Sequence, residues 1–265
     1  MTNERIAAAF AAAKADGRAA LMPYMMGGFP DPETADAVAT AYADAGADLV
    51  ELGVPYSDPL ADGPVIHAAG TRALAGGATL EAVLATCERL AARLPVVPMA
   101  YANMIFARGA AAFARLLADA GATGAIVPDL PPEEGGEIAS ELRGAGLALI
   151  PLVAPTTPPD RRARICAEAE GFIYLVSDTR TTGERERLPD ALGELIAATQ
   201  ADSAVPVAVG FGIGTPEQAA QVGAVADGVI VGTRLVRAVG EAPDAAGAAS
   251  AVTDFITAAR AAMEA

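Results

Sequence analysis

The chain has 265 residues, of which 53% are hydrophobic, and its formal net charge of −15 goes with a pI of about 4.4. This acidity, unbroken by any cluster of Lys and Arg, argues against a nucleic-acid partner. The chain shows neither the basic start of a signal peptide nor a run of about 18 apolar residues, so we expect a cytoplasmic protein without a membrane span.

Helical and strand patterns alternate along the chain, after an alanine-rich opening helix expected at 4–15. Capping residues or first-turn prolines mark several helix starts: Asp31-Pro32, Pro64, Thr79 and the capping-box sequence at 215–218. The expected strands are 19–26, 49–52, 96–101, 124–127, 147–153, 172–176, 206–209 and 228–231. The helices between and after them are expected at 31–45, 64–74, 79–94, 110–120, 133–145, 159–169, 190–199, from Thr215 onward, 233–239 and 244–263.

Strand and helix thus repeat eight times, and the strands are rich in Val, Ile and Leu without polar alternation. This pattern predicts a parallel sheet buried on both faces. Eight units in this length predict an α/β fold of one domain, residues 1–265, a single (β/α)8 TIM barrel with an extra N-terminal helix. An open doubly wound sheet is the alternative, but its G-x-G-x-x-G after the first strand is missing. Cys87 and Cys166 fall in helical stretches, and we expect both to be reduced.

Two carboxylates stand where such barrels place their reacting groups, at the C-terminal ends of strands and in the loops that follow. Glu51 ends the second strand, and Asp62 lies 62 − 51 = 11 residues later, just before Pro64. A carboxylate inside an apolar strand loses hydration, which is costly unless the group is paired or used. We therefore expect a function for Glu51, whereas Asp62 by itself could equally be an acid at a helix N-terminus.

Glycine-rich turns follow the seventh and eighth strands. Gly210, Gly212 and Gly214 stand at alternate positions, where backbone N–H groups can approach an anion closely. Gly232-Thr233 stands where a short helix would begin, and the free N–H groups there can hold a phosphate without any lysine. Barrels often bind phosphate at these two loops, so we expect a phosphorylated ligand.

Seven segments carry a resemblance to a known family. They are ELGVPYSDPLADGPVI from residue 51, PMAYANMIF at 98–106, VPDLPPEE at 127–134, GFIYLVS at 171–177, TTG at 181–183, VGFGIGTPEQ at 209–218 and GVIVGTRLV at 228–236. In this order they resemble the tryptophan synthase alpha subunit, and the resemblance covers nearly the whole chain. It implies a carbon–carbon lyase of tryptophan biosynthesis that cleaves indole-3-glycerol phosphate to indole and glyceraldehyde 3-phosphate.

The resemblance also implies roles for individual residues. Glu51 would be the acid/base glutamate and Asp62 the second catalytic aspartate, while Asp58 would face a beta subunit in an α2β2 complex. Thr182 would be the loop threonine that closes over Asp62. The phosphate contacts would fall on Gly183, Gly212, Gly232 and Thr233. The indole pocket would include Ile66, Met99, Tyr101, Tyr174 and Phe211.

The loop after the sixth strand departs from the family pattern, which usually reads S-R-x-G-V-T-G. Here Asp178 replaces the usual arginine and Arg180 replaces the glycine, while Thr182 and Gly183 are kept. An arginine restricts the backbone more than a glycine, so the departure bears on how this lid closes and how closure couples to a partner.

The chemistry can proceed with the residues at hand. Aldol cleavage often uses a lysine Schiff base or a metal, but Lys14 is the only lysine and His67 the only histidine, and His67 is expected to be an ordinary helix residue. Protonation of indole at C3 makes an indolenine that is itself the electron sink, so neither cofactor nor metal is needed. We expect Glu51, with a raised pKa, to move the protons, and an ionised Asp62 to hold the indole N–H.

Two other functions fit parts of the pattern. A sugar-phosphate isomerase or epimerase on the same kind of barrel would act on phosphorylated sugars that carry no indole. A non-catalytic chain that only activates a beta subunit would not need Glu51, Asp62, Thr182 and Gly183 together.

Overall fold

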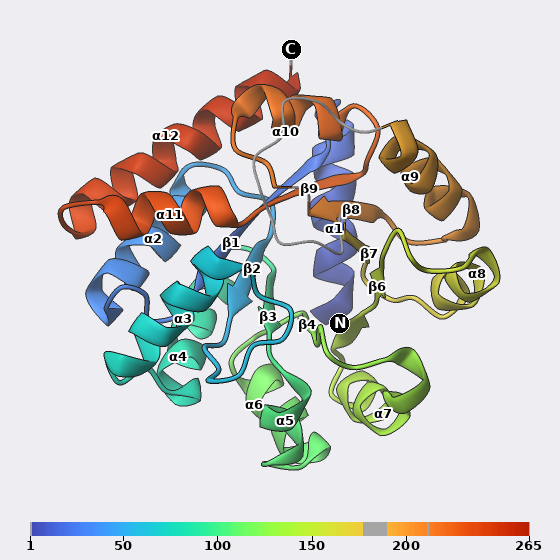
Figure 1. The fold of residues 1–265 in the computed structure, drawn as a ribbon, viewed down its shortest axis with the longest axis horizontal. Coiled ribbons are helices and arrows are strands. Elements are labelled where there is room, and N and C mark those ends of the chain that lie inside the picture. Colours follow the sequence, from blue (N-terminus) through green and yellow to red (C-terminus); the bar gives the residue numbers. More distant parts are fainter. Residues whose placement is uncertain (1, 177–189, 211, 265) are drawn as a thin grey trace.

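The computed structural model describes residues 2–176, 190–210 and 212–264. Within these ranges nine strands, all paired in parallel, form one sheet in the order β5-β4-β3-β2-β1-β9-β8-β7-β6. Its two end strands, β5 and β6, are consecutive in the chain and separated only by Pro151, so the sheet nearly closes on itself. Figure 1 looks onto the resulting barrel with its surrounding helices, and the expected (β/α)8 fold is confirmed.

The strands lie close to the expected positions. They are β1 (Ala20–Met26), β2 (Val50–Gly53), β3 (Val96–Met99), β4 (Gly124–Ile126), β5 (Ala148–Ile150), β6 (Leu152–Val153), β7 (Ile173–Val176), β8 (Val207–Gly210) and β9 (Gly228–Val231). The expected strand 147–153 is divided at Pro151, because proline has no N–H to donate to a sheet ladder. Pro151 still accepts a hydrogen bond from Tyr174 N at 2.9 Å, so the wall of the barrel continues across the break.

The helices are α1 (Thr2–Ala15), α2 (Pro32–Asp44), α3 (Pro64–Ala75), α4 (Leu80–Ala91), α5 (Ala102–Phe106), α6 (Ala110–Asp119), the 3₁₀ helix η1 (Pro132–Glu134), α7 (Gly136–Gly144), α8 (Pro159–Ala167), α9 (Asp190–Asp202), α10 (Pro216–Gly223), α11 (Thr233–Glu241) and α12 (Ala245–Glu264). Helix α5 was not expected from the sequence, because it is too short to show a helical period. The helix expected at 133–145 is instead η1 followed by α7.

The predicted helix starts are confirmed by their hydrogen bonds. The Asp31 side chain accepts from Thr34 N at 2.9 Å, and the Thr79 hydroxyl accepts from Ala82 N at 3.2 Å. Thr215 and Gln218 form the expected reciprocal capping box at the start of α10. Each cap satisfies an N–H group that would otherwise lack a partner at the helix end.

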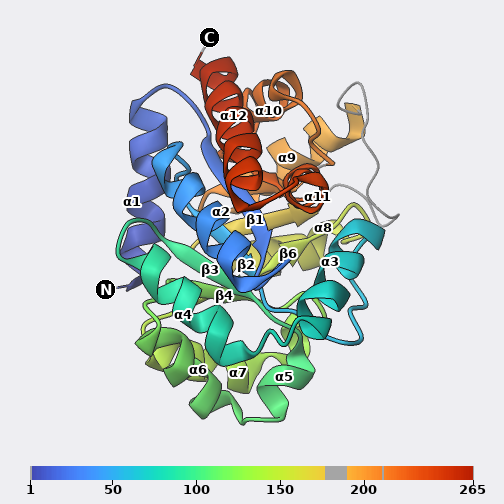
Figure 2. The same ribbon diagram turned by 90° about the vertical axis from the view of Figure 1, so that its left-hand side faces the viewer.

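Small and branched apolar side chains fill the inside of the barrel. The residues of this inner core are Ala20, Met22, Leu49, Val97, Ile126, Ala148, Ile150, Phe172, Ala208 and Ile230. Helix α1 contributes Ile6, Phe10 and Ala13 to the same cluster, and the rings of Phe10 and Phe172 lie 5.7 Å apart. Helix α1 therefore closes the N-terminal end of the barrel, on the left in Figure 2, and leaves the other end for a site.

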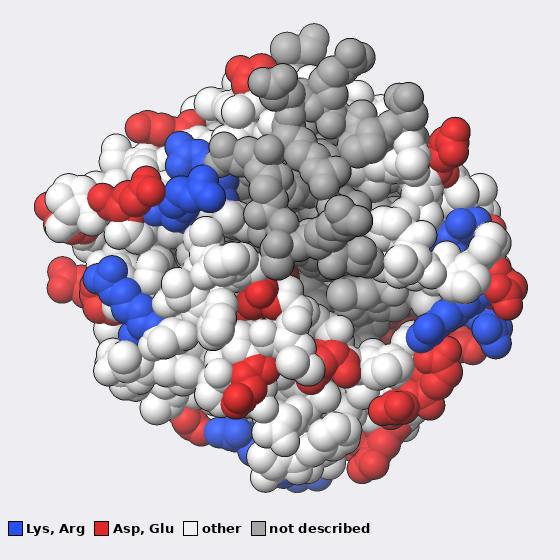
Figure 3. Space-filling view, in the orientation of Figure 1, with Lys and Arg blue, Asp and Glu red and all other residues white. Residues whose placement is uncertain are grey.

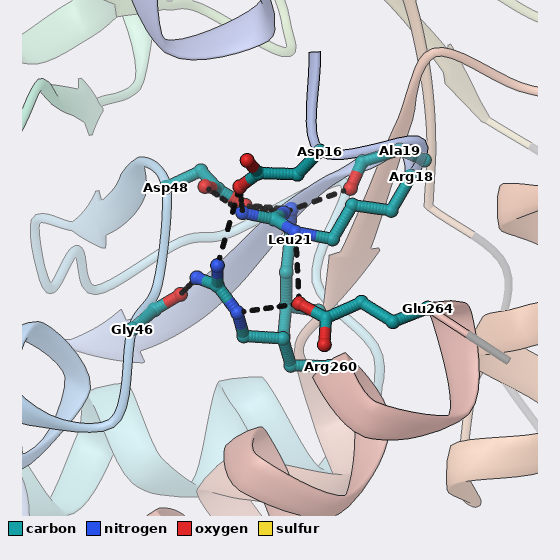
Figure 4. Close-up of polar contacts among 8 residues, drawn as sticks. All are labelled: Asp16, Arg18, Ala19, Leu21, Gly46, Asp48, Arg260 and Glu264. Atoms are coloured by element: carbon teal, nitrogen blue, oxygen red, sulfur yellow. Dashed lines mark hydrogen bonds and ion pairs between the residues drawn. The ribbon is translucent and has the colours of Figure 1, made fainter. Parts of the chain in front are cut away.

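An ion-pair network supports the N-terminal end of the barrel (Figure 4). The Arg18 guanidinium, with a side chain only 2% exposed, contacts both carboxylate oxygens of Asp48 at 2.5 and 2.8 Å. Asp16 and Glu264 lie 3.4 and 3.5 Å from Arg18, and Arg260 bridges these two acids. The pKa of Arg18 is raised, chiefly by its hydrogen bonds to Asp48. The network joins the start of β1, the loop before β2 and the C-terminal helix.

Acidic residues outnumber basic ones in the chain, with 33 Asp and Glu against 18 Lys and Arg. In Figure 3 a few acidic side chains lie near the centre of the face shown, and both acidic and basic side chains lie around its edge. Cys87 and Cys166 are buried and unpaired, as expected. No helix in residues 2–176, 190–210 and 212–264 has the length and apolarity needed to cross a bilayer.

Candidate active site

Glu51 lies on β2 and faces the inside of the barrel. It follows the inner-core residue Leu49 by two positions, and side chains two apart on a strand share a face. The residue is only 2% exposed, and its Oε2 atom has no hydrogen-bond partner among the described residues. Burial raises the pKa of Glu51 to about 8, helped by the charge of Asp62, while a hydrogen bond from Tyr174 acts in the lowering direction. A largely protonated Glu51 is therefore expected at neutral pH.

Asp62 is half-buried and held by a phenol. Tyr101 Oη donates to Asp62 Oδ1 at 2.9 Å and accepts from Ala61 N at 3.1 Å. The N-cap of α3 is Gly63, with no side-chain cap, so Asp62 makes no capping hydrogen bond, although it lies one residue before the N-cap as an acid at the helix N-terminus. Burial raises the pKa of Asp62, whereas the Tyr101 hydrogen bond and the nearby charge of His67 lower it. Asp62 thus lies in a wetter and better hydrogen-bonded place than Glu51.

The loops that carry Asp62 and Tyr101 support each other. The rings of Tyr56 and Tyr101 stack with centroids 5.2 Å apart, which joins the loop after β2 to the end of β3. Asp129, in the loop after β4, accepts a hydrogen bond from Ala102 N at 2.8 Å and so fixes the start of α5. Three consecutive strand ends are therefore linked around the carboxylates.

The residues expected in the indole pocket lie on these same elements. Met99 ends β3 and Ile66 lies in the first turn of α3, and both are partly buried against the core. Tyr174 on β7 is half-buried, and its phenol acts on Glu51 as described above. Thr182, Gly183 and Phe211, like the substituted lid residues Asp178 and Arg180, lie outside the described residues.

The expected phosphate-binding turns lie at the ends of β8 and β9. Gly212 has a positive φ of 39°, a conformation that favours glycine. Gly232 is the N-cap of α11 and Thr233 its first residue, so the amino end of this helix points to the mouth. The N–H of Gly214 is not available to an anion as the sequence suggested, because it donates to Gln218 Oε1 at 2.7 Å in the capping box.

Sequence reasoning missed Tyr24, a buried phenol on β1. Its Cα pairs in register with Glu51 on β2, and its pKa is raised well above the usual value, by burial first and then by the charges of Asp62 and Glu51. In sequence, Tyr24 reads as one more apolar residue of a buried strand. Its spacing of two from Met22 and four from Ala20 is the signal that could have placed it on the inner face of the strand. Among the described residues no group of three His, Cys, Asp or Glu side chains is arranged to hold a metal ion.

The fold and the site together define a class: a (β/α)8-barrel enzyme with two unlike carboxylates at the mouth and glycine turns suited to an anion. Known proteins narrow this class. Residues 10–265 match the family described as "Tryptophan synthase alpha chain". The chain belongs to this family, which confirms the expected membership and, with it, the expected class of lyase in tryptophan biosynthesis.

Individual relatives are similar over most of their length. The tryptophan synthase alpha chain of Prochlorococcus marinus is 47% identical, over 89% of this chain and 87% of the relative. That of Halorhodospira halophila is 44% identical, over 98% and 96%. A solved structure of Mycobacterium tuberculosis tryptophan synthase superimposes with a TM-score of 0.92 at 37% identity, covering 98% of each chain. The alpha subunit from Legionella pneumophila gives a TM-score of 0.87 at 38% identity, again covering 98% of each chain.

Proposed function

We propose that the chain cleaves indole-3-glycerol phosphate to indole and glyceraldehyde 3-phosphate, with Glu51 as the acid and base and Asp62 as the carboxylate that holds the indole N–H. The observation that carries this proposal is the contrast between the two acids. Glu51 is 2% exposed with a pKa of about 8, and Asp62 is half-buried and hydrogen-bonded by Tyr101. Two carboxylates with different protonation preferences are what a reaction needs when one proton is donated and one positive charge is stabilised.

The reaction balances with these two groups. Glu51 gives its proton to C3 of the indole, and the ring becomes an indolenine whose positive charge spreads to the ring nitrogen near Asp62. The hydroxyl on the adjacent carbon then loses its proton to Glu51, and its C–O bond becomes the aldehyde C=O. The C–C bond breaks, and its electron pair returns to the ring as neutral indole. Glu51 ends protonated as it began, so no further reactant is consumed.

The remaining expected contacts are proposed around these two groups. Gly212, Gly232 and Thr233 would hold the phosphate through backbone N–H groups and the amino end of α11, together with Gly183 outside the described residues. The indole would lie against Ile66, Met99, Tyr101, Tyr174 and Phe211, with Thr182 of the lid over Asp62. Backbone binding suits a chain whose only lysine, Lys14, lies in α1 at the closed end of the barrel.

We also propose that the mouth is where a beta subunit binds. Two large apolar side chains are exposed there, Leu60 at 86% and Phe106 at 63%. Leu60 lies with Asp58 in the loop after β2, and Phe106 ends α5, which follows β3. The stacked rings of Tyr56 and Tyr101 connect these two segments. Exposed apolar residues of this size favour a protein partner. With its reduced, buried cysteines the chain suits the cytoplasm.

The test is indole release from indole-3-glycerol phosphate by the purified chain, with and without a beta subunit. Glu51→Gln should abolish turnover. Asp62→Asn should lower turnover by about a hundredfold or more, because the loss of one electrostatic contact in a site that excludes water slows a reaction by about that factor. Glu88→Gln, which removes an exposed acid on α4, is the matched control and should be fully active.

Three outcomes would contradict the proposal. Retained turnover in Glu51→Gln would remove Glu51 from its role. A wild-type chain that releases no indole but stimulates a beta subunit would make it a non-catalytic activator. Turnover of phosphorylated sugars without indole release would make it an isomerase or epimerase of the same barrel class.

A further inference from the structure

Tyr24 and Glu51 form a register pair across the first two strands of the barrel. Side chains of residues paired in register point to the same face of a sheet, and Ala20 and Met22, four and two positions earlier than Tyr24, lie in the inner core. The phenol of Tyr24 and the carboxyl of Glu51 therefore both project into the barrel mouth. Tyr42, on α2, donates a hydrogen bond to the Tyr24 carbonyl oxygen at 3.0 Å from the outer side of the strand.

Both inward groups have unused hydrogen-bonding capacity. Glu51 Oε2 is buried with no hydrogen-bond partner among the described residues. Tyr24 is 4% exposed, and its hydroxyl donates to the Met26 thioether Sδ at 3.9 Å, a weak acceptor. A buried polar group without a good partner destabilises the folded protein, because it has lost its hydrogen bonds to water. A polar group of a ligand placed between these two register neighbours could form hydrogen bonds with both of them.

Neighbouring glycines make room for the phenol. A Cβ on Gly53, two residues after Glu51 on the same face of β2, would lie 2.1 Å from the Tyr24 hydroxyl oxygen. The phenol therefore crosses β2 toward the mouth and occupies the place that a side chain at position 53 would take. Gly232, before α11, lies against the base of the same ring, because a Cβ there would contact Tyr24 Cβ at 3.6 Å. The ring thus runs from the end of β9, where its base lies, to the inner face of β2 at Gly53, two residues after Glu51.

We propose that Tyr24 is a further catalytic residue, whose phenol donates a hydrogen bond to the substrate hydroxyl oxygen while Glu51 takes the proton of that hydroxyl. This inference rests on the proposed function. In the cleavage step the O–H proton moves to Glu51, the C–O bond becomes C=O, the C–C bond breaks and its electron pair enters the ring. Tyr24 keeps its own proton throughout and stabilises the negative charge that develops on the oxygen. Its raised pKa keeps it a donor over the working pH range.

The test compares Tyr24→Phe with Tyr42→Phe. Each variant removes one buried phenol hydroxyl bonded at the same strand, but the first hydroxyl faces the mouth and the second faces α2. Tyr24→Phe should lower kcat and kcat/KM together by about a hundredfold, because the lost donor acts on charge present only in the transition state. Tyr42→Phe should keep kcat within about twofold. Tyr24→Phe should melt no lower than wild type, because its hydroxyl has only a weak acceptor to lose.

The outcomes separate this inference from the proposed function. If wild type releases indole, Glu51→Gln does not, and Tyr24→Phe retains the wild-type kcat, the role of Tyr24 is wrong and the proposed function stands. A rise in KM alone would assign Tyr24 to ground-state binding and contradict the transition-state role. A shift in the pH profile of kcat/KM would show that Tyr24 acts on Glu51 rather than on the substrate, and would also overturn the inference.

Discussion

Glu51 and Asp62 carry the same carboxyl group, but their surroundings differ. Glu51 is enclosed by the barrel and loses nearly all its hydration, so its pKa rises to about 8. Asp62 stands in a loop, and its pKa is raised by burial but held back by Tyr101 and His67. At neutral pH the first is mostly a proton donor, and the second remains the better anion.

This contrast predicts a bell-shaped pH dependence of kcat/KM. Activity needs Glu51 protonated and Asp62 ionised, so it should fall above about pH 8 as Glu51 loses its proton, and fall again in acid as Asp62 gains one. In Asp62→Asn, residual activity should lose the acid limb. Its alkaline limb should move to lower pH, because the Asp62 charge helps to raise the pKa of Glu51.

Unfolding measurements provide an independent check on the same pKa. The folded-state pKa of Glu51 lies above its unfolded value of about 4.3, so the contribution of Glu51 to stability is present below that value and is lost as pH rises through about 8. Glu51→Gln should therefore gain stability relative to wild type as pH rises from about 4.3 to about 8, the interval between these two pKa values. A constant difference between the two proteins across this range would contradict the raised pKa.

The role of Glu51 could be anticipated from sequence because a carboxylate in an apolar strand is itself unusual. The role of Tyr24 could not, because a tyrosine in such a strand is ordinary core. Its even spacing from Met22 and Ala20 indicates the inner face of the strand, but the register with Glu51 and the approach of its hydroxyl to Gly53 come only from the structure. Asp62 was ambiguous until the structure showed Gly63 as the cap and Tyr101 as the partner of the acid. The catalytic roles of both carboxylates stay predictions.

Among the secondary-structure elements, the strand–helix alternation was predictable because each buried strand is a continuous apolar run and several helices start at a cap or a proline. The departures are local. Pro151 divides one strand into β5 and β6, and α5 is a five-residue helix whose start is fixed by Asp129 from another loop. Such a contact between loops has no signal in the local sequence.

The ion-pair network around Arg18 leads to a prediction about the stability of the elements that it joins. Asp48 is only 10% exposed in its side chain, and it binds Arg18 and also accepts from Leu21 N at 2.7 Å. Asp48→Asn would leave the Arg18 charge buried without its main partner, which should lower the free energy of unfolding by about 3 kcal/mol. Urea unfolding would measure this loss. The activity of the folded variant should be normal, because Arg18 and Asp48 precede β1 and β2, at the end of the barrel where these strands start, whereas the Glu51 side chain faces the inside of the barrel.

Asp44→Asn is the matched control for this prediction. Asp44 pairs with Arg93 at 2.7 Å, but both side chains are well exposed, at 61% and 45%. An exposed pair contributes less than about 1 kcal/mol, so this variant should unfold close to wild type. If the two substitutions lower the free energy of unfolding equally, the burial of Arg18 does not make its ion pair more stabilising than an exposed one.

At the scale of the whole molecule, one end of the barrel is closed by α1 and the other carries the site, the glycine turns and the exposed Leu60 and Phe106. That residues 1–265 form one domain stays a prediction, which a single unfolding transition with coincident probes would support. The barrel itself was predictable from the eight repeats. The exposure of Phe106 was not, because its segment reads only as an apolar stretch after a strand.

The proposed partner surface can be tested at the level of the assembly. Phe106→Ser should weaken binding of the beta subunit by about tenfold or more, since a large exposed aromatic side chain is the kind of residue that dominates an interface. Val225→Ser is the control, because Val225 is 44% exposed and lies in the turn between α10 and β9, at the end of the barrel away from the mouth. Calorimetric titration of each variant with the beta subunit would measure the change. If Val225→Ser weakens binding and Phe106→Ser does not, the partner binds the closed end of the barrel. Its effect on Glu51 would then have to pass through the whole inner core rather than through the loop that carries Asp62.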